Sequence, residues 1–117
     1  MSESILTSVK KYLGITEDYI HFDAEIIDCI NASFSTLTQL GAGPRTGFSI
    51  SDSSAVWTDF IPAGPLLELV VTYVQRKTKL MFDPPNAAAM LEALKTIVSE
   101  QEFRINSYAD YPEEEGG

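Results

Sequence analysis

A rigid break, Phe82-Asp83-Pro84-Pro85, separates two long segments with the hydrophobic spacing of helices. Proline lacks an amide hydrogen, fixes its own φ and disfavours the helical conformation of the residue before it. One helix must therefore end between Met81 and Asp83. Pro85 can sit in the first turn of the next helix, where a missing donor costs nothing. The break predicts two long helices held at a fixed angle.

Apolar residues three and four positions apart mark the helices on both sides of this break. One pattern begins at Pro65 and is nearly apolar for two turns. Such a wide apolar stripe implies burial against several neighbours, either the other helices or another copy of the chain. After the break the same spacing continues from Ala87 to about Asn106.

Two further helices are expected before residue 41. The first covers residues 4–13, with Ser2 or Ser4 as its N-cap and Gly14 in the left-handed conformation that ends a helix. The second covers residues 23–40, with Asp23 as its N-cap, and stops before a glycine.

Residues 41–62 are rich in Gly, Pro and Ser and form a long connection. Phe48 and Ile50 alternate with polar neighbours and Trp57 lies in a second apolar cluster, which favours a short strand or hairpin followed by a helical turn. Structureless loops of about 20 residues are uncommon and usually functional. The loop is a candidate contact surface, although its aromatic residues can equally fold back onto the helices. Both interpretations hold if the aromatics anchor the loop and its tip, Gly41 to Gly47, projects.

The expected architecture is all-α, a small bundle of about four helices with a long loop between the second and third. Residues 1–106 form the helical domain. Residues 107–117 lack periodicity and end in three glutamates and two glycines, so an acidic, extended tail is expected there.

Charge argues against several functions. The formal net charge is −9, which disfavours binding to nucleic acid phosphates or to an anionic membrane. The one basic cluster is Arg76, Lys77 and Lys79. Ion pairs with another copy or a partner are the favoured role for this cluster, ahead of pairs within the chain and of DNA binding.

No catalytic, metal-binding or cofactor-binding pattern is recognisable. A single cysteine, Cys29, excludes an internal disulfide, and His21 is the only histidine. The glycines from Gly41 to Gly47 lack the spacing of a nucleotide-binding loop. No segment approaches the ~20 apolar residues of a membrane span, and the N-terminus does not have the pattern of a signal peptide, so synthesis in the cytoplasm is expected.

An ordered set of short motifs resembles the head-tail connector proteins, or neck adaptors, of long-tailed bacteriophages. The set comprises Leu13-Gly14-Ile15, Glu17-Asp18, Phe22-Asp23-Ala24-Glu25-Ile26, Ile30-Asn31, Gln39-Leu40-Gly41, Trp57, Tyr73-Val74 with Lys77, Phe82-Asp83-Pro84-Pro85 and Glu102-Phe103-Arg104-Ile105-Asn106. The resemblance implies a structural protein and no enzyme. Such a protein forms a ring of about twelve copies below the portal in the virion neck, after synthesis in the host cytoplasm. Its ring would pass double-stranded DNA, without sequence-specific binding, toward a stopper or tail-completion protein.

The resemblance also implies roles for particular residues. Contacts with portal or stopper are assigned to Ala42, Gly43, Pro44, Arg45, Thr46, Gly47 and Phe48 in the loop and to Tyr108, Tyr111, Glu113, Glu114 and Glu115 near the C-terminus. Contacts between subunits are assigned to Arg76, Lys77, Lys79 and Arg104, and structural roles to Trp57, Phe82, Asp83, Pro84 and Pro85. The tail is expected on the portal. The alternative function is a small regulatory or adaptor protein that binds a cellular partner through the central loop.

Overall fold

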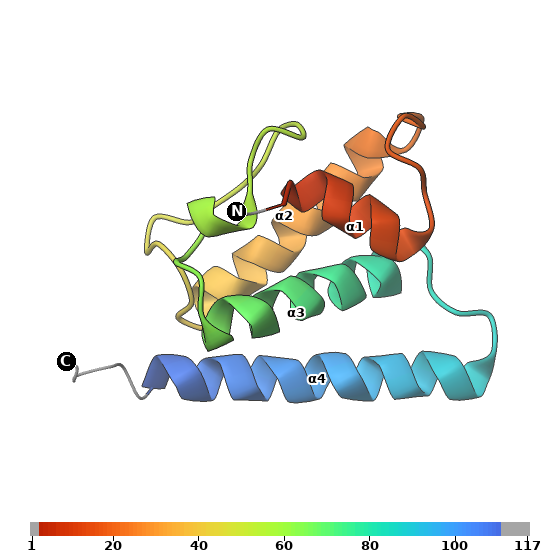
Figure 1. Cartoon of the computed structure of the whole chain (residues 1–117). Coiled ribbons are helices and arrows are strands. Elements are labelled where there is room, and N and C mark those ends of the chain that lie inside the picture. Colours follow the sequence, from red (N-terminus) through yellow and green to blue (C-terminus); the bar gives the residue numbers. More distant parts are fainter. Residues whose placement is uncertain (1–2, 111–117) are drawn as a thin grey trace.

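The computed structural model describes residues 3–110 and contains four helices and one short helical turn (Figure 1). These are α1 (Ile5–Leu13), α2 (Asp23–Gln39), the 3-10 turn η1 (Trp57–Asp59), α3 (Pro65–Phe82) and α4 (Ala88–Asp110). The predicted all-α fold is confirmed. Residues 3–110 contain no β-strand, only an isolated antiparallel bridge between Ser4 and Val56, so the expected strand or hairpin does not form. The expected helical turn is η1.

Helix α1 has the caps that its sequence predicts. The Ser4 hydroxyl accepts a hydrogen bond from the Thr7 amide at 3.2 Å, which satisfies one of the free donors at the helix start. Gly14 has φ of 82°, and its amide bonds to a carbonyl of the last turn. A left-handed glycine therefore ends the helix.

Helix α2 starts differently from the prediction. Phe22 occupies the N-cap position, and Asp23 is the first helical residue. The Asp23 carboxylate lies 2.9 Å from the ammonium of Lys10, a side chain only 2% exposed. Lys10 also donates to the Glu17 carbonyl at 3.0 Å. A buried ammonium requires a counter-charge, so Asp23 pairs with α1 instead of capping α2.

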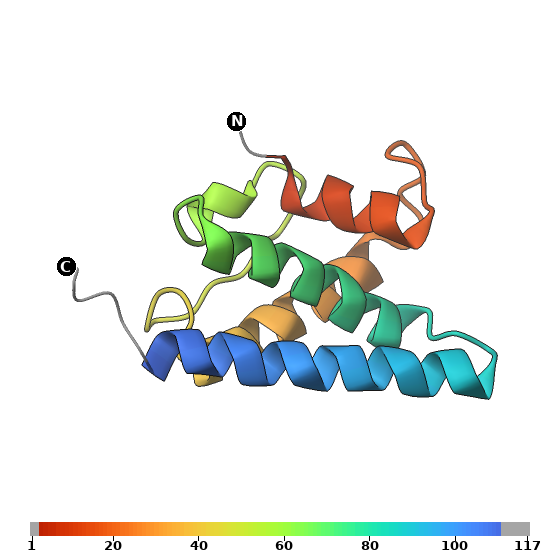
Figure 2. The same cartoon turned by 60° about the horizontal axis from the view of Figure 1, so that its bottom comes forward.

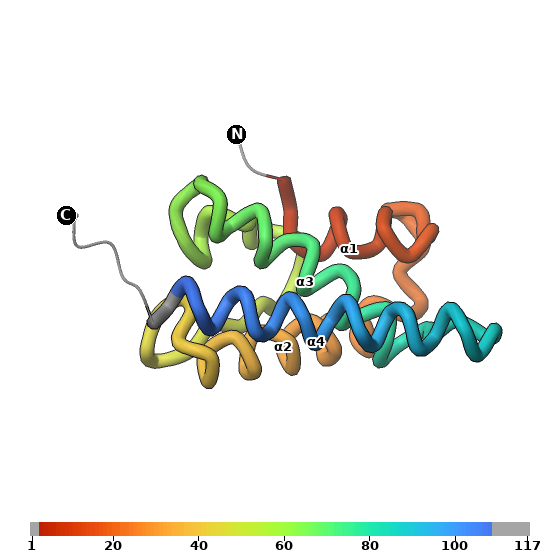
Figure 3. The backbone as a smooth tube through the Cα atoms, turned by 90° about the horizontal axis from the view of Figure 1, so that it is seen from below, coloured from red at the N-terminus to blue at the C-terminus, as the bar shows by residue number. Residues whose placement is uncertain are grey.

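Helix α3 is the centre of the molecule. Its side chains Val70, Tyr73 and Val74 are fully buried, and it packs against α1, α2 and α4 (Figure 2). Seen from below, α4 lies in front of α2 and α3 (Figure 3). Helix α4 packs mainly on α3, which leaves much of its surface exposed.

Helix α4 begins later and ends later than its periodicity predicts. It starts at Ala88, so Pro85 lies before the helix and not in its first turn. At the other end, Ile105 is fully buried and Asn106 Nδ2 donates to the Leu40 carbonyl at 3.1 Å. These contacts hold the end of α4 against the end of α2, and the helix continues to Asp110. Residues 107–110 of the expected tail are therefore helical.

Replacing Asp23 by Asn should destabilise the protein, because Lys10 would keep a buried charge without its partner. We expect a loss of about 3 kcal/mol in the free energy of unfolding, measured by urea titration. Glu92→Gln is the matched control, since it removes one exposed i,i+3 ion pair with Lys95 and should cost under about 0.5 kcal/mol. Equal losses in the two variants would contradict the role of the buried pair.

Candidate assembly surfaces

The possible metal ligands of the described residues are scattered. Residues 3–110 include no group of three or more His, Cys, Asp or Glu side chains that could hold a metal ion. His21 is exposed, with its ring 4.7 Å from that of Phe22. No helix in this part of the chain is long and apolar enough to cross a bilayer.

The long loop before α3 is anchored to α2. Asn31 replaces a β-strand partner: its amide nitrogen donates to the Ile50 carbonyl at 3.0 Å, and its oxygen accepts from the Ile50 amide at 2.8 Å. The Phe48 ring lies 4.8 Å from Phe34 and 5.2 Å from Phe60 between ring centres. Phe48 is thus an anchor, so most of its surface is unavailable to a partner.

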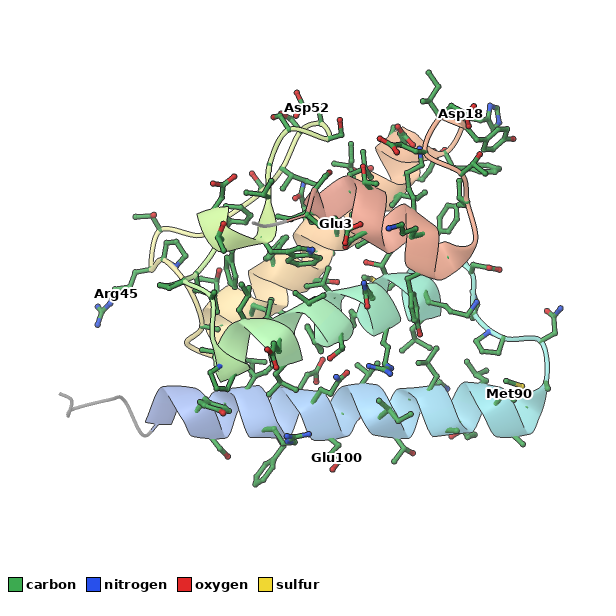
Figure 4. All side chains as sticks on the ribbon, viewed as in Figure 1. Glu3, Asp18, Arg45, Asp52, Met90 and Glu100 are labelled. Atoms are coloured by element: carbon green, nitrogen blue, oxygen red, sulfur yellow. The ribbon has the colours of Figure 1, made fainter. Side chains whose placement is uncertain are left out.

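The tip of this loop projects while its aromatic residues anchor the loop, which is the arrangement that allows both sequence interpretations (Figure 4). Ala42 is buried, and its amide bonds to the Leu37 carbonyl at 2.9 Å. Pro44, Arg45 and Thr46 are exposed, and Arg45 points away from the helices (Figure 4). The exposed part of the predicted loop surface is therefore residues 44–46.

The far end of the loop is tied to α1. Trp57 is buried, and its ring nitrogen donates to the Ser8 hydroxyl at 3.0 Å. The Ile5 amide donates to the Ala55 carbonyl at 3.0 Å. These contacts connect the first helix with the segment before α3, which is consistent with the structural role assigned to Trp57.

The seam between α3 and α4 is polar. The Glu102 carboxylate accepts a hydrogen bond from the Tyr73 hydroxyl at 2.8 Å and one from the Lys77 ammonium at 3.3 Å. Gln101 Nε2 donates to Thr72 Oγ1 at 2.8 Å. Burial and the neighbouring Glu102 carboxylate raise the pKa of Tyr73 well above its usual range. Lys77 therefore has a partner within the chain, and its role between subunits stays a prediction.

The other three cations predicted to contact neighbouring subunits, Lys79, Arg76 and Arg104, differ in whether they form an ion pair within the chain. Lys79 lies 3.4 Å from the Asp83 carboxylate and donates to the Asp83 carbonyl at 3.1 Å. Arg76 and Arg104 form no ion pair with any of residues 3–110. Both lysines of this predicted set form ion pairs within the described chain, whereas the two arginines do not, so the arginines are available to pair with another subunit.

The proline break forms the corner between α3 and α4. The Asp83 amide donates to the Lys79 carbonyl at 2.9 Å and ends α3. Phe82 contacts Phe22, with ring centres 5.5 Å apart, so the corner also touches the segment before α2. Pro84 is exposed and Pro85 lines a groove beside α4.

This groove has a volume of about 250 Å³ and opens between the end of α1, the second half of α3 and the first half of α4. Its lining is mainly apolar and includes two basic side chains from α3. The lining residues are Tyr12, Arg76, Lys79, Pro85, Met90, Ala93, Leu94 and Ile97. We call it the α1/α3/α4 groove.

A second apolar surface lies on the loop of residues 16–22, between α1 and α2. Ile20 is 70% exposed, and Tyr19 and Phe22 are also exposed. The sequence does not predict this surface, because its only signal is an apolar group without helical spacing. Helix α4 adds exposed apolar side chains at Met90, Ile97, Phe103 and Tyr108. Tyr111, Glu113, Glu114 and Glu115 lie outside the described residues.

The phage connector protein family matches the chain over residues 5–112, which includes all four helices. The chain belongs to this family. The match confirms the resemblance seen in the motifs. No significant match was found among the curated proteins or the solved structures.

Membership of this family gives the protein a structural role as a connector of the phage particle. Family members are structural proteins and not enzymes, and the family indicates a location in the virion. The surfaces of this connector are therefore best understood as places where it meets other virion proteins.

Titration of Tyr73 should couple stability to pH in the alkaline range. The pKa of Tyr73 is raised in the folded protein, so its contribution to stability is complete below the unfolded pKa of about 10 and is lost as pH rises above it. We expect the free energy of unfolding to fall above pH 10 in the wild type. Tyr73→Phe should reduce this fall, measured by urea unfolding between about pH 8 and 11. An unchanged pH profile in Tyr73→Phe would refute the assignment.

Replacing Gly43 by Ala should cost more stability than the same change at Gly47. Both glycines have positive φ, 81° and 94°, so each substitution strains the backbone by about 1 kcal/mol. A β-carbon at Gly43 would also collide with the Phe60 ring, whereas Gly47 has free space there. We expect an additional loss of about 1–3 kcal/mol for Gly43→Ala in thermal or urea unfolding. Equal losses at the two sites would show that Phe60 moves aside freely.

Proposed function

We propose that this connector forms a ring of about twelve copies below the portal and continues the DNA channel toward the stopper and tail. The observation that carries the proposal is that six of the nine large apolar side chains exposed among the described residues lie on two unlike surfaces, the loop of residues 16–22 and the α1/α3/α4 groove. A ring built from head-to-tail contacts needs two different complementary surfaces on each subunit. Membership of the connector family supports the same reading.

The charge distribution suits a channel through which DNA passes without being held. The protein has a formal net charge of −9. All five lysines form ion pairs with carboxylates of the same chain. Affinity for DNA comes mainly from cations that displace counterions from phosphates, and few free cations remain here. A ring of such subunits would repel the DNA backbone.

The contacts with neighbouring components are assigned to two parts of the chain, the loop tip and the C-terminal segment. The loop tip, Pro44 to Thr46, and exposed Tyr108 on α4 are available in the described structure. The C-terminal segment beyond Asp110 adds Tyr111 and three glutamates. We assign that segment to the portal and the loop tip to the stopper or tail-completion protein.

The ring is tested by mixing the purified connector with the portal protein of the same phage. We expect the connector alone to be monomeric or weakly associated in size-exclusion chromatography with light scattering. With portal, negative-stain images should show an added ring on the portal face. Absence of any ring on the portal would overturn the proposal and favour a regulatory protein that acts through its loop.

Removing residues 111–117 should leave the fold intact and abolish binding to the portal. The deletion begins after α4, so helix content and thermal stability should remain near those of the wild type. The binding is measured by co-sedimentation with portal. A variant with Glu113, Glu114 and Glu115 changed to Gln keeps the length and removes the charge, and so separates the two contributions. Full binding by the truncated protein would contradict the role of the tail.

A further inference from the structure

We infer that the loop of residues 16–22 of one copy docks in the α1/α3/α4 groove of the next copy. The inference rests on the proposed ring and names the contact that builds it. The occupant of the groove is thus a second copy of this chain, and the contact joins an apolar, acidic loop to an apolar groove whose lining includes two basic side chains.

The loop has the form of a preorganised ligand. Ile20 projects with 70% of its surface exposed. The rings of Tyr19, His21 and Phe22 pack on one another at 4.7–6.1 Å between centres, and Phe22 is itself fixed against Phe82. Little conformational freedom remains to be lost when such a loop binds, which favours association.

The groove offers the matching apolar surface. Its lining includes exposed Tyr12 from α1, exposed Met90 and Ile97 from α4, and buried Leu94. Its volume of about 250 Å³ is sufficient for projecting side chains of the loop. Burial of large apolar side chains in a pocket is the usual source of affinity at an interface.

Charge complementarity points to this particular pairing. The carboxylates of Glu17 and Asp18 are exposed and form no ion pair with any of residues 3–110. Arg76, which lines the groove, is likewise without an ionic partner in that part of the chain, and Lys79, which also lines it, pairs only with exposed Asp83. Docking the loop brings its two unpaired acids to the unpaired guanidinium, which orients the subunits.

Because the loop and the groove lie on different parts of the subunit, each copy can make the same contact with two neighbours. Asp18 stands at the top of the molecule in Figure 4, whereas Met90 lies on α4 at the bottom, with the end of α1 between the two regions. A copy that offers its loop to one neighbour keeps its groove free for another. Contacts of this heterologous type generate a closed ring when the rotation per subunit allows closure.

Cysteine cross-linking tests the contact directly. In a Cys29→Ser background, Ile20→Cys with Met90→Cys should give a ladder of disulfide-linked oligomers on non-reducing gels when the protein is assembled on the portal. The matched control is Ile20→Cys with Phe103→Cys, because Phe103 is 73% exposed but does not line the groove. We expect at least about a ten-fold lower yield of linked oligomers for the control.

Charge exchange supplies a second, independent readout. Arg76→Glu alone and Asp18→Arg alone should each weaken assembly about ten-fold or more, because each places like charges together. The two changes combined should restore most of the assembly, measured by light scattering in the presence of portal. If either residue acts only within its own subunit, the double variant should not regain assembly.

The outcomes separate this inference from the proposed function. A ring on the portal without the Ile20–Met90 ladder, or without recovery in the charge-exchanged pair, would overturn the loop-in-groove contact and leave the ring intact. A wild-type protein that forms no ring would overturn both. A ladder together with recovery supports the contact.

Discussion

Burial of α3 is the constraint on which the rest of the structure depends. Val70, Tyr73 and Val74 are fully buried because α1, α2 and α4 all pack on this one helix. A helix with so wide an apolar surface is stable only when several neighbours cover it, since packing and not helix propensity supplies most of its stability. The proline corner after Phe82 then fixes where α4 can lie, and so determines which side of α4 stays exposed.

Three polar contacts help to select how the helices and the long loop are placed against one another. Lys10 with Asp23, Asn31 with Ile50, and Glu102 with Tyr73 each join two different elements of the fold, and each involves buried or partly buried groups. A buried polar group left without a partner costs about 1–3 kcal/mol, so alternative arrangements of the same helices are disfavoured. The apolar contacts provide stability, and these polar contacts select one arrangement.

The helices could be predicted from the sequence because their signals are local. Apolar spacing, the Ser4 and Gly14 caps and the proline break all act within a few residues. The errors arise where a distant residue decides the outcome. Asp23 has the sequence of a helix cap, but Lys10 takes its charge. The alternation at Phe48 and Ile50 is typical of a strand, but the Asn31 side chain supplies the bonds that a neighbouring strand would give.

Contact surfaces were harder to predict, because the same residue type serves both the core and the surface. Phe48 and Phe103 are both phenylalanines next to polar residues, yet Phe48 packs on Phe34 while Phe103 is 73% exposed. Only the fold distinguishes them. In the folded protein each lysine forms an ion pair with a carboxylate of the same chain. Among the lysines and arginines of the described residues, only the arginines are therefore available for ion pairs with a neighbouring copy. Recognition between copies must then come mainly from apolar shape, with arginine fixing the orientation.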